Sequence, residues 1–241
     1  MARLPRYGVA GQPQHVIQRG NNRSPIFFAP GDYEFFLECL SDGCAQYSCA
    51  IHAYVLMTNH VHLLVTPKSA DGISRLMQSV GRRYVQFVNY TYRRSGTLWE
   101  GRYKAVPMDS EGYLMTCYRY IEANPVRAGM VTHPGGYRWS SYPHNADGKP
   151  DALIHAHAVY RELGADDKAR CAVYRKLFRE EIGDADLTAI RESVNKGWLL
   201  GSERFAGKIA AVTQRRVAPL ARGGRRKGAG RYKREQDVEE G

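Results

Sequence analysis

Two histidines separated by a single valine, His60 and His62, have the residue type and the spacing of a metal-binding pair. They lie in an apolar run rich in β-branched residues, 55–65, which predicts a strand. Side chains two residues apart point to the same face of a strand, whereas in a helix they diverge by about 200°. A second pair with this spacing, His155 and His157, lies in a stretch with a helical pattern. We therefore expect only the first pair to share one ion.

Tyr120 and Asn124 lie four residues apart in a segment that predicts a helix, so both side chains can project toward one point. A phenol has an unperturbed pKa of about 10 and is a poor nucleophile until a cation or a base favours its anion. A metal ion held by the histidines could bind the non-bridging oxygens of a phosphodiester, with the amide oxygen of Asn124 as a further ligand. The alternative is a core tyrosine near the end of a helix that Asn124 caps before Pro125, and spacing alone favours this alternative.

The elements that would position these residues follow from the apolar periodicity. It predicts strands at 14–19, 49–56, 60–66 and 104–108, and helices at 32–47, 72–93 and from 109 or 110 to 124. Two split strand-helix-strand halves make an α+β, ferredoxin-like sandwich, with a four-stranded antiparallel sheet, helices on one face and a further helix carrying Tyr120. A turn-rich linker is expected at 140–150. Beyond it, short helices are expected at 152–163, 166–181, 186–195 and 202–214.

The charge and the thiols narrow the class of protein. The 241 residues hold 35 basic and 24 acidic side chains, a net charge of +11 that favours a polyanionic partner. Glycine and basic residues without acidic ones at 215–234 predict a disordered basic tail, 215–241, which either contacts nucleic acid or only aids solubility. The five cysteines, without any Cys-x-x-Cys, indicate reduced thiols rather than disulfides or structural zinc.

The hydropathy of the sequence does not indicate a membrane protein. No apolar run reaches the roughly 18 residues of a membrane span, and the first residues lack the apolar core of a signal peptide. We therefore expect a cytoplasmic protein with no membrane partner.

The segments around both motifs resemble a known family. MTNHVHLL at 57–64 and YIEANPVRAG at 120–129 resemble the signatures of single-tyrosine HUH transposases, specifically the REP-associated tyrosine transposases. HVIQRGNNR at 15–23 and LWEGRY at 98–103 resemble the same family. The resemblance covers residues 1–145, which would form the catalytic domain, with a helical C-terminal extension at 146–214 and the basic tail at 215–241. The combination favours the chemical interpretation of Tyr120.

The resemblance implies a transposase that nicks and rejoins single-stranded DNA near a hairpin, through a covalent 5′-phosphotyrosine and a free 3′-hydroxyl. By matching position, Tyr120 would be the nucleophile, His60 and His62 the metal ligands, and Asn124 the third ligand, where related insertion-sequence transposases have glutamine. The resemblance implies magnesium or manganese, and manganese suits two imidazoles and an amide better because magnesium prefers oxygen ligands. A phosphotyrosine keeps the energy of the broken bond, so rejoining needs no nucleotide cofactor.

Basic and aromatic side chains near these segments are the candidates for contacts with single-stranded or hairpin DNA, since cations neutralise phosphates and aromatic rings stack on unpaired bases. The candidates are Arg19, Arg23, Arg82, Arg83, Arg102, Tyr103, Lys104 and Arg127.

Several alternatives stay open. Tyr113 shares the helical face of Tyr120, whereas Tyr118 points away, and Glu122 is expected to be solvated or salt-bridged. A hairpin-binding protein without turnover and a metal-dependent hydrolytic nuclease remain as functional alternatives, and the oligomeric state, monomer or homodimer, is not indicated.

Overall fold

The computed structural model describes residues 6–217 and contains one four-stranded sheet. Its strands are β1 (Gln14–Arg19), β2 (Cys49–Met57), β3 (His60–Pro67) and β4 (Lys104–Pro107), in the order β2-β3-β1-β4 with every neighbouring pair antiparallel. Helix α1 (Pro30–Tyr47) connects β1 to β2, and α2 (Gly72–Thr91) connects β3 to β4. The predicted α+β fold with two split strand-helix-strand halves is confirmed.

The strand register decides which side chains share a face. In the β1·β3 pair, Arg19 lies opposite His60, Ile17 opposite His62 and His15 opposite Leu64. Directly opposed residues of an antiparallel pair point to the same side, and residues two apart along a strand do so as well. One face of the sheet therefore carries both predicted ligands together with side chains from β1.

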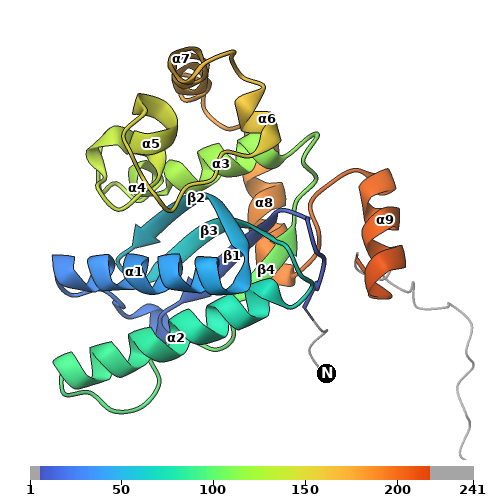
Figure 1. Cartoon of the computed structure of the whole chain (residues 1–241). Coiled ribbons are helices and arrows are strands. Elements are labelled where there is room, and N and C mark those ends of the chain that lie inside the picture. Colours follow the sequence, from blue (N-terminus) through green and yellow to red (C-terminus); the bar gives the residue numbers. More distant parts are fainter. Residues whose placement is uncertain (1–5, 218–241) are drawn as a thin grey trace, which may run out of the picture.

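The two faces of the sheet are covered by different helices (Figure 1). Figure 1 shows α1 and α2 side by side along one face, where Val16, Leu63 and Val65 pack into their core. Helix α3 (Leu114–Glu122) contacts β2 and β3 from the histidine side. The remaining helices are α4 (Asn124–Arg127), α5 (Tyr142–Asp147), α6 (Ala158–Arg161), α7 (Asp167–Leu177), α8 (Asp184–Lys196) and α9 (Glu203–Thr213), with single 3-10 turns at Asn21–Arg23 and Pro134–Gly136.

The tyrosine helix differs from its prediction at both ends. It begins at Leu114 rather than at 109 or 110, because the Asp109 carboxylate accepts hydrogen bonds from the Ser202 amide at 3.1 Å and the Ser202 hydroxyl at 2.8 Å. It ends at Glu122, and Pro125 stands in the first turn of α4, where its missing N–H costs nothing. The proline therefore begins a short helix instead of closing the long one, and Asn124 belongs to α4.

The predicted linker at 140–150 is wrong. It contains helix α5, in which Tyr142 and Asn145 are each 1 % exposed. The predicted helix at 152–163 shrinks to α6, because the chain before it runs beside β2 and the His155 amide donates to the Ile51 carbonyl at 2.7 Å. Helices α7 and α8 correspond to the predicted ones with shifted ends.

The chain after α9 is described only to residue 217. Arg215 lies 3.8 Å from the centre of the Tyr7 ring, and Arg216 lies 5.3 Å from that of Trp198, so these two predicted tail residues pack against aromatic rings. The rest of the predicted basic tail, 218–241, lies outside the described residues. No helix within residues 6–217 combines the length and the apolar character that crossing a bilayer requires.

His52 of β2 is expected to make the stability of the protein depend on pH. Its Nδ1 lies 2.6 Å from the His155 carbonyl and its Nε2 2.8 Å from the Thr66 hydroxyl, and burial lowers its pKa to about 4. A depressed histidine pKa means that the unfolded chain binds the proton more tightly, so the contribution is full above about pH 6.5 and is lost as the pH falls through 4.

Urea unfolding of the wild type and of His52→Gln at pH 7 and pH 5 measures this contribution. The wild type should lose about 1–2 kcal/mol more than the variant over that interval, because only the wild type carries this group. Other histidines titrate in both proteins and cancel in the difference. An equal loss in the two proteins would contradict the prediction.

Candidate active site

The two histidines of β3 point into the space beneath α3. Their ring centroids are 4.9 Å apart. The Nδ1 atom of His60 lies 2.6 Å from the Asn59 amide oxygen, and that of His62 lies 2.9 Å from Nε2 of His15. Each ring is thus oriented through Nδ1, and Nε2 is the nitrogen left for an ion, the arrangement typical of metal-bound histidines.

His15 is a functional candidate that sequence reasoning did not select. It is fully buried, lies 5.1 Å from the His62 ring in a stacked arrangement, and meets the Tyr120 ring edge-on at 5.7 Å. Its own Nδ1 has no hydrogen-bond partner among the described residues. The resemblance of segment 15–23 to the family could have pointed to His15. The β1·β3 register that brings His15 to His62, however, cannot be derived from residue spacing.

The surroundings keep all three imidazoles neutral. Burial lowers the pKa of His15 to about 3 and the pKa of His60 to about 4, with smaller contributions from nearby arginines. Burial is the main cause that lowers the pKa of His62 well below its usual range. The positive charge that His15 or His60 would carry when protonated lowers this pKa further. The neutral ring carries the lone pair that a metal requires, so at pH 7 this pair is in its ligating form.

Tyr120 projects from α3 toward these rings. Its ring centroid lies 5.9 Å from that of His62, and the residue is 8 % exposed. The Arg127 guanidinium lies 4.4 Å from the centre of the Tyr120 ring and donates to the Tyr120 carbonyl at 2.5 Å. Burial lowers the pKa of Arg127 to about 10, which leaves it charged at neutral pH. The charged guanidinium therefore makes a cation–π contact with the Tyr120 ring.

The contacts of Asn124 correspond to the capping role, one of its two predicted roles. Its Nδ2 donates to the carbonyls of Tyr120 at 2.9 Å and Ile121 at 3.2 Å, which caps the end of α3. Its amide oxygen accepts no hydrogen bond from the described residues. Among residues 6–217 no three His, Cys, Asp or Glu side chains gather as a metal-binding group. Two neutral imidazoles and one amide oxygen fit a divalent cation such as manganese.

Two further side chains of α3, Tyr118 and Glu122, face away from the histidines. Tyr118 is fully buried on the side away from the histidines, and Tyr113 stands at the N-terminal cap. Glu122 was expected to be solvated or salt-bridged, and this is wrong, because it is fully buried and accepts hydrogen bonds from three neutral donors. Burial raises its pKa to about 7.

The predicted DNA-contacting residues divide into several groups. Arg19 follows the histidine face at the end of β1, Arg23 lies next to the β2·β3 turn through a bond from Asn59 to its carbonyl, and Lys104 is exposed on β4. Arg83 is paired with Asp42 at 2.8 Å and Glu38 at 3.8 Å, which offsets its charge.

Arg82, Arg102 and Tyr103 line one cavity of about 450 Å³. Trp99, Arg6 and Gln18 are also in its wall. The Arg6 guanidinium lies over the Tyr103 ring at 3.8 Å, and the Tyr103 hydroxyl lies 3.0 Å from that of Ser74. Neither Arg82 nor Arg102 has a carboxylate partner within residues 6–217, so both are available to phosphates.

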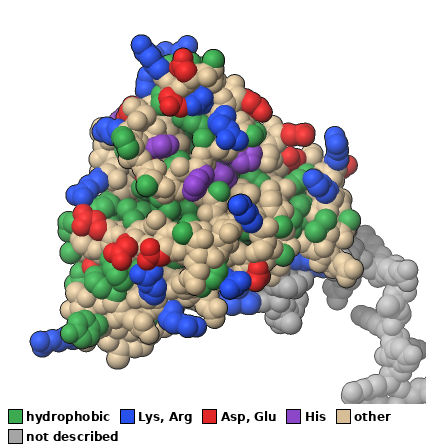
Figure 2. All heavy atoms as spheres, in the orientation of Figure 1, with side chains coloured by type: hydrophobic (Ala, Val, Ile, Leu, Met, Phe, Trp, Pro, Cys, Tyr) green, Lys and Arg blue, Asp and Glu red, His purple; other side chains and the backbone are tan. Residues whose placement is uncertain are grey.

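The cavity and Tyr120 lie on opposite faces of the sheet. Gln18 of the cavity wall lies between Ile17 and Arg19 on β1, so its side chain points toward α2 while theirs point to the histidine face. Figure 2 shows basic and acidic side chains interspersed over the face in view, without one dominant patch of either sign. No single charged patch on this face marks a DNA-binding surface.

Comparison with known proteins finds a family model that is similar to part of the chain. Residues 9–124, just under half of the chain, match the model described as "Transposase IS200 like", and the matched region includes both histidines, Tyr120 and Asn124. No curated protein matches the sequence.

Two solved structures are similar to this chain to different degrees. A REP-associated tyrosine transposase bound to a REP hairpin is 17% identical, with a TM-score of 0.53, and the match covers 66% of this chain and 93% of that one. A candidate transposase from Deinococcus radiodurans R1 is 23% identical over 51% of this chain and 96% of that one, with a TM-score of 0.36. The first likeness supports the same sheet and helix arrangement.

Proposed function

We propose that this protein, whose residues 9–124 match the IS200-like transposase family, nicks and rejoins single-stranded DNA through Tyr120. One observation carries the proposal above all. The Tyr120 ring, from α3, meets the His62 ring, from β3, at 5.9 Å, and His60 stands beside it on the same strand. A nucleophile and a pair of neutral imidazoles thus come from distant parts of the chain to one point.

The proposed chemistry is two phosphoryl transfers. The phenolic oxygen of Tyr120 attacks phosphorus, a bond from phosphorus to tyrosine forms, the bond to the 3′ oxygen breaks, and that oxygen leaves with a proton as a 3′-hydroxyl. In the reverse direction a 3′-hydroxyl attacks the 5′-phosphotyrosine and releases the phenol. Arg127 stabilises the phenolate in both directions from its place over the ring.

The residues of the site would hold a divalent cation through His60, His62 and the amide oxygen of Asn124. The chemistry supplied by such a cation is withdrawal of negative charge from the non-bridging oxygens of the phosphodiester. His15 holds His62 through its Nδ1, and Asn59 holds His60 in the same way. These two partners keep the rings in the orientation and tautomer that a ligand needs.

The proposed substrate is a DNA hairpin with unpaired flanks. The structure with the shared fold contains a REP hairpin, and the charge of +11 on this chain suits a polyanion. A palindromic repeat of this kind is the target that we propose for this protein.

Trapping of the covalent intermediate tests the proposal. A 5′-phosphotyrosine holds the strand on the 3′ side of the nick, so hairpin DNA labelled at its 3′ end should leave a labelled protein band in a denaturing gel when manganese is present. Cleavage with no protein-linked label would favour a hydrolytic nuclease instead. Binding of the hairpin with neither cleavage nor adduct would favour a binding protein without turnover.

Arg82 and Arg102 are expected to contribute to DNA affinity through phosphates. Arg82→Ala and Arg102→Ala should each weaken binding of a hairpin with single-stranded flanks about tenfold, and should flatten the dependence of log affinity on log salt by about 1. Titrations by fluorescence anisotropy at several salt concentrations measure both quantities.

Arg75→Ala is the matched control, because Arg75 lies on the same helix but is exposed and paired with Asp71 at 3.8 Å. Its removal takes away the same formal charge outside the cavity. An equal loss of affinity and of salt slope in this variant would show that only the overall charge of α2 matters, against the prediction.

A further inference from the structure

We propose that the segment from residue 140 to residue 178 positions the tyrosine helix for the reaction, and that Glu122 is the positioning residue that joins the two. The inference rests on the proposed role of Tyr120. Glu122 and Tyr120 are two residues apart on α3, so their side chains diverge by about 200° around the helix. One points to the histidines, and the other points into the core formed with the C-terminal segment.

The Glu122 carboxyl group is held by three side chains of that segment. Its Oε1 accepts from the Ser141 hydroxyl at 2.5 Å and from the Asn145 amide at 2.7 Å, and its Oε2 accepts from the Tyr174 hydroxyl at 2.6 Å. The residue is fully buried. A buried carboxyl group is costly without such partners, so the three donors and the acceptor require one another.

The helix itself gains nothing from an acid at this position. Glu122 is the last residue of α3, where the partial negative charge of the helix end disfavours a carboxylate. The chain then breaks at Ala123 before α4 begins. The glutamate is therefore explained by the contacts it makes outside α3, not by the stability of α3 alone.

Ser141 connects the same carboxyl group to the sheet. Its hydroxyl accepts from the Tyr54 amide of β2 at 2.9 Å, and its own amide donates to the Tyr54 carbonyl at 3.0 Å. The edge of the sheet, the C-terminal segment and α3 thus meet at Glu122. Since β2 pairs with β3, this junction relates the tyrosine helix to the strand that carries both histidines.

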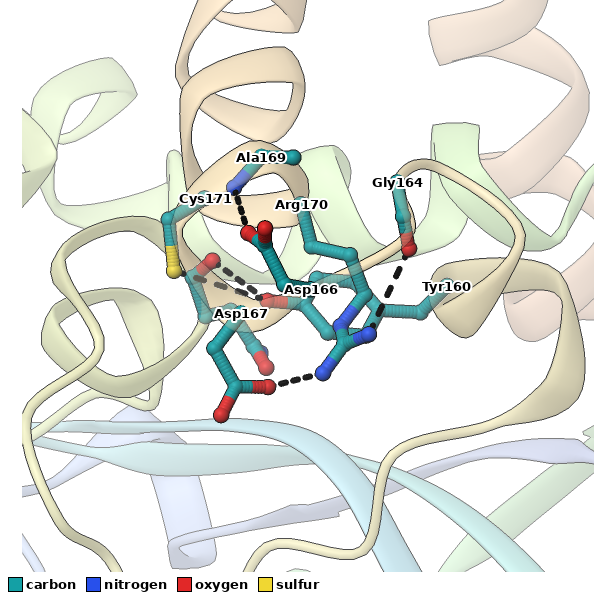
Figure 3. Close-up of polar contacts among 8 residues, drawn as sticks. Tyr160, Gly164, Asp166, Asp167, Ala169, Arg170 and Cys171 are labelled. Atoms are coloured by element: carbon teal, nitrogen blue, oxygen red, sulfur yellow. Dashed lines mark hydrogen bonds and ion pairs between the residues drawn. The ribbon is translucent and has the colours of Figure 1, made fainter.

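Tyr174 comes from α7, whose N-terminal end is held independently (Figure 3). The Asp166 carboxylate accepts from the Ala169 amide at 2.7 Å, Arg170 donates to the Gly164 carbonyl at 3.3 Å and pairs with Asp167, and the Tyr160 hydroxyl lies near the Cys171 sulfur. These contacts fix the start of α7, about two turns before Tyr174. Tyr174, which donates to Glu122, therefore lies on a helix whose start is held by contacts of its own.

A comparison of Tyr174→Phe with Tyr118→Phe tests the inference. Both changes remove one hydroxyl from the same aromatic cluster, but the Tyr118 hydroxyl has no hydrogen-bond partner among the described residues. We expect the single-turnover rate of adduct formation to fall about tenfold in Tyr174→Phe and to stay near the wild type in Tyr118→Phe. The Kd for hairpin DNA without divalent cations should be unchanged in both.

The conservative variant provides the second test, which also serves if Tyr174→Phe fails to fold. Glu122→Gln keeps the shape and most of the hydrogen bonds and should retain much of the rate, whereas Glu122→Leu should not. Parallel losses of rate and DNA affinity, or equal rates in Tyr174→Phe and Tyr118→Phe, would overturn the inference.

Hydrogen exchange of the α3 amides, read by mass spectrometry, separates this inference from the proposed function. Exchange across residues 114–123 should be faster in Tyr174→Phe than in Tyr118→Phe whether or not the protein cuts DNA. If the wild type forms no adduct but the exchange differs in this way, only the proposed function fails. Equal exchange in the two variants would refute the positioning role even in an active enzyme.

Discussion

The Tyr120→Phe variant is expected to form no covalent adduct with DNA and to lose cleavage by about 10⁴-fold or more. The change removes only the phenolic oxygen that would attack phosphorus. The ring keeps its contacts with His15, His62 and the Arg127 guanidinium, so fold and DNA affinity should remain. Denaturing gels with 3′-labelled hairpin measure the adduct, and anisotropy in EDTA measures the affinity.

The same helix offers matched controls for this change. Tyr118 is fully buried on the opposite side of α3, and its hydroxyl has no hydrogen-bond partner among the described residues, so Tyr118→Phe should leave adduct formation unchanged. Tyr113→Phe addresses the other tyrosine that shares the helical face of Tyr120. If Tyr120→Phe still forms an adduct and Tyr113→Phe does not, the nucleophile has been assigned to the wrong residue.

The parts of the fold that the sequence predicts are those encoded by local periodicity. The alternating run 55–65 and the helical spacing in 72–93 predicted β2, β3 and α2 within a few residues of their observed ends. The split strand-helix-strand order then predicted the sheet. The same alternation placed His60 and His62 on one face, and this follows from strand geometry without tertiary information.

The parts that were missed depend on contacts between distant residues. His15 reaches His62 only through the β1·β3 register, and one carboxylate oxygen of Asp109 binds Ser202, 93 residues later, while the other accepts from the Glu111 amide. Glu122 looked like a surface acid because its three partners lie 19, 23 and 52 residues further along the chain. A polar residue whose local sequence predicts a helix cap or an exposed charge can be buried instead, when distant residues supply its hydrogen-bond partners.

The misassigned linker at 140–150 has the same origin. Pro143, Gly148 and Pro150 are turn signals, but Pro143 stands in the first turn of α5 and Gly148 caps its end in the left-handed conformation, at φ 69°. These residues therefore mark the two ends of a short helix. Burial of Tyr142 and Asn145 then makes this helix part of the core that supports α3.

Loss of either strand histidine is the second change with a large expected effect. His60→Ala and His62→Ala should each lower manganese-dependent cleavage by about 10²-fold or more, because each removes one of the two neutral imidazoles proposed to hold the cation. DNA affinity in EDTA should change little, since both residues lie beneath α3 and not in the cavity with Arg82 and Arg102. Chelation of divalent ions should abolish cleavage by the wild type in the same assay.

The second His-x-His pair supplies the control for these variants. His155 is exposed on the strand-flanking chain before α6, whereas the His157 ring accepts from the Val159 amide and caps that helix. His155→Ala therefore removes an imidazole of the same local spacing without breaking a cap, and it should keep the wild-type rate and manganese response. If cleavage in His60→Ala and His62→Ala persists at the His155→Ala rate, the imidazoles of β3 do not hold the catalytic cation. In that case Tyr120 would have to be activated by Arg127 alone, and any required cation would have to bind elsewhere in the protein–DNA complex.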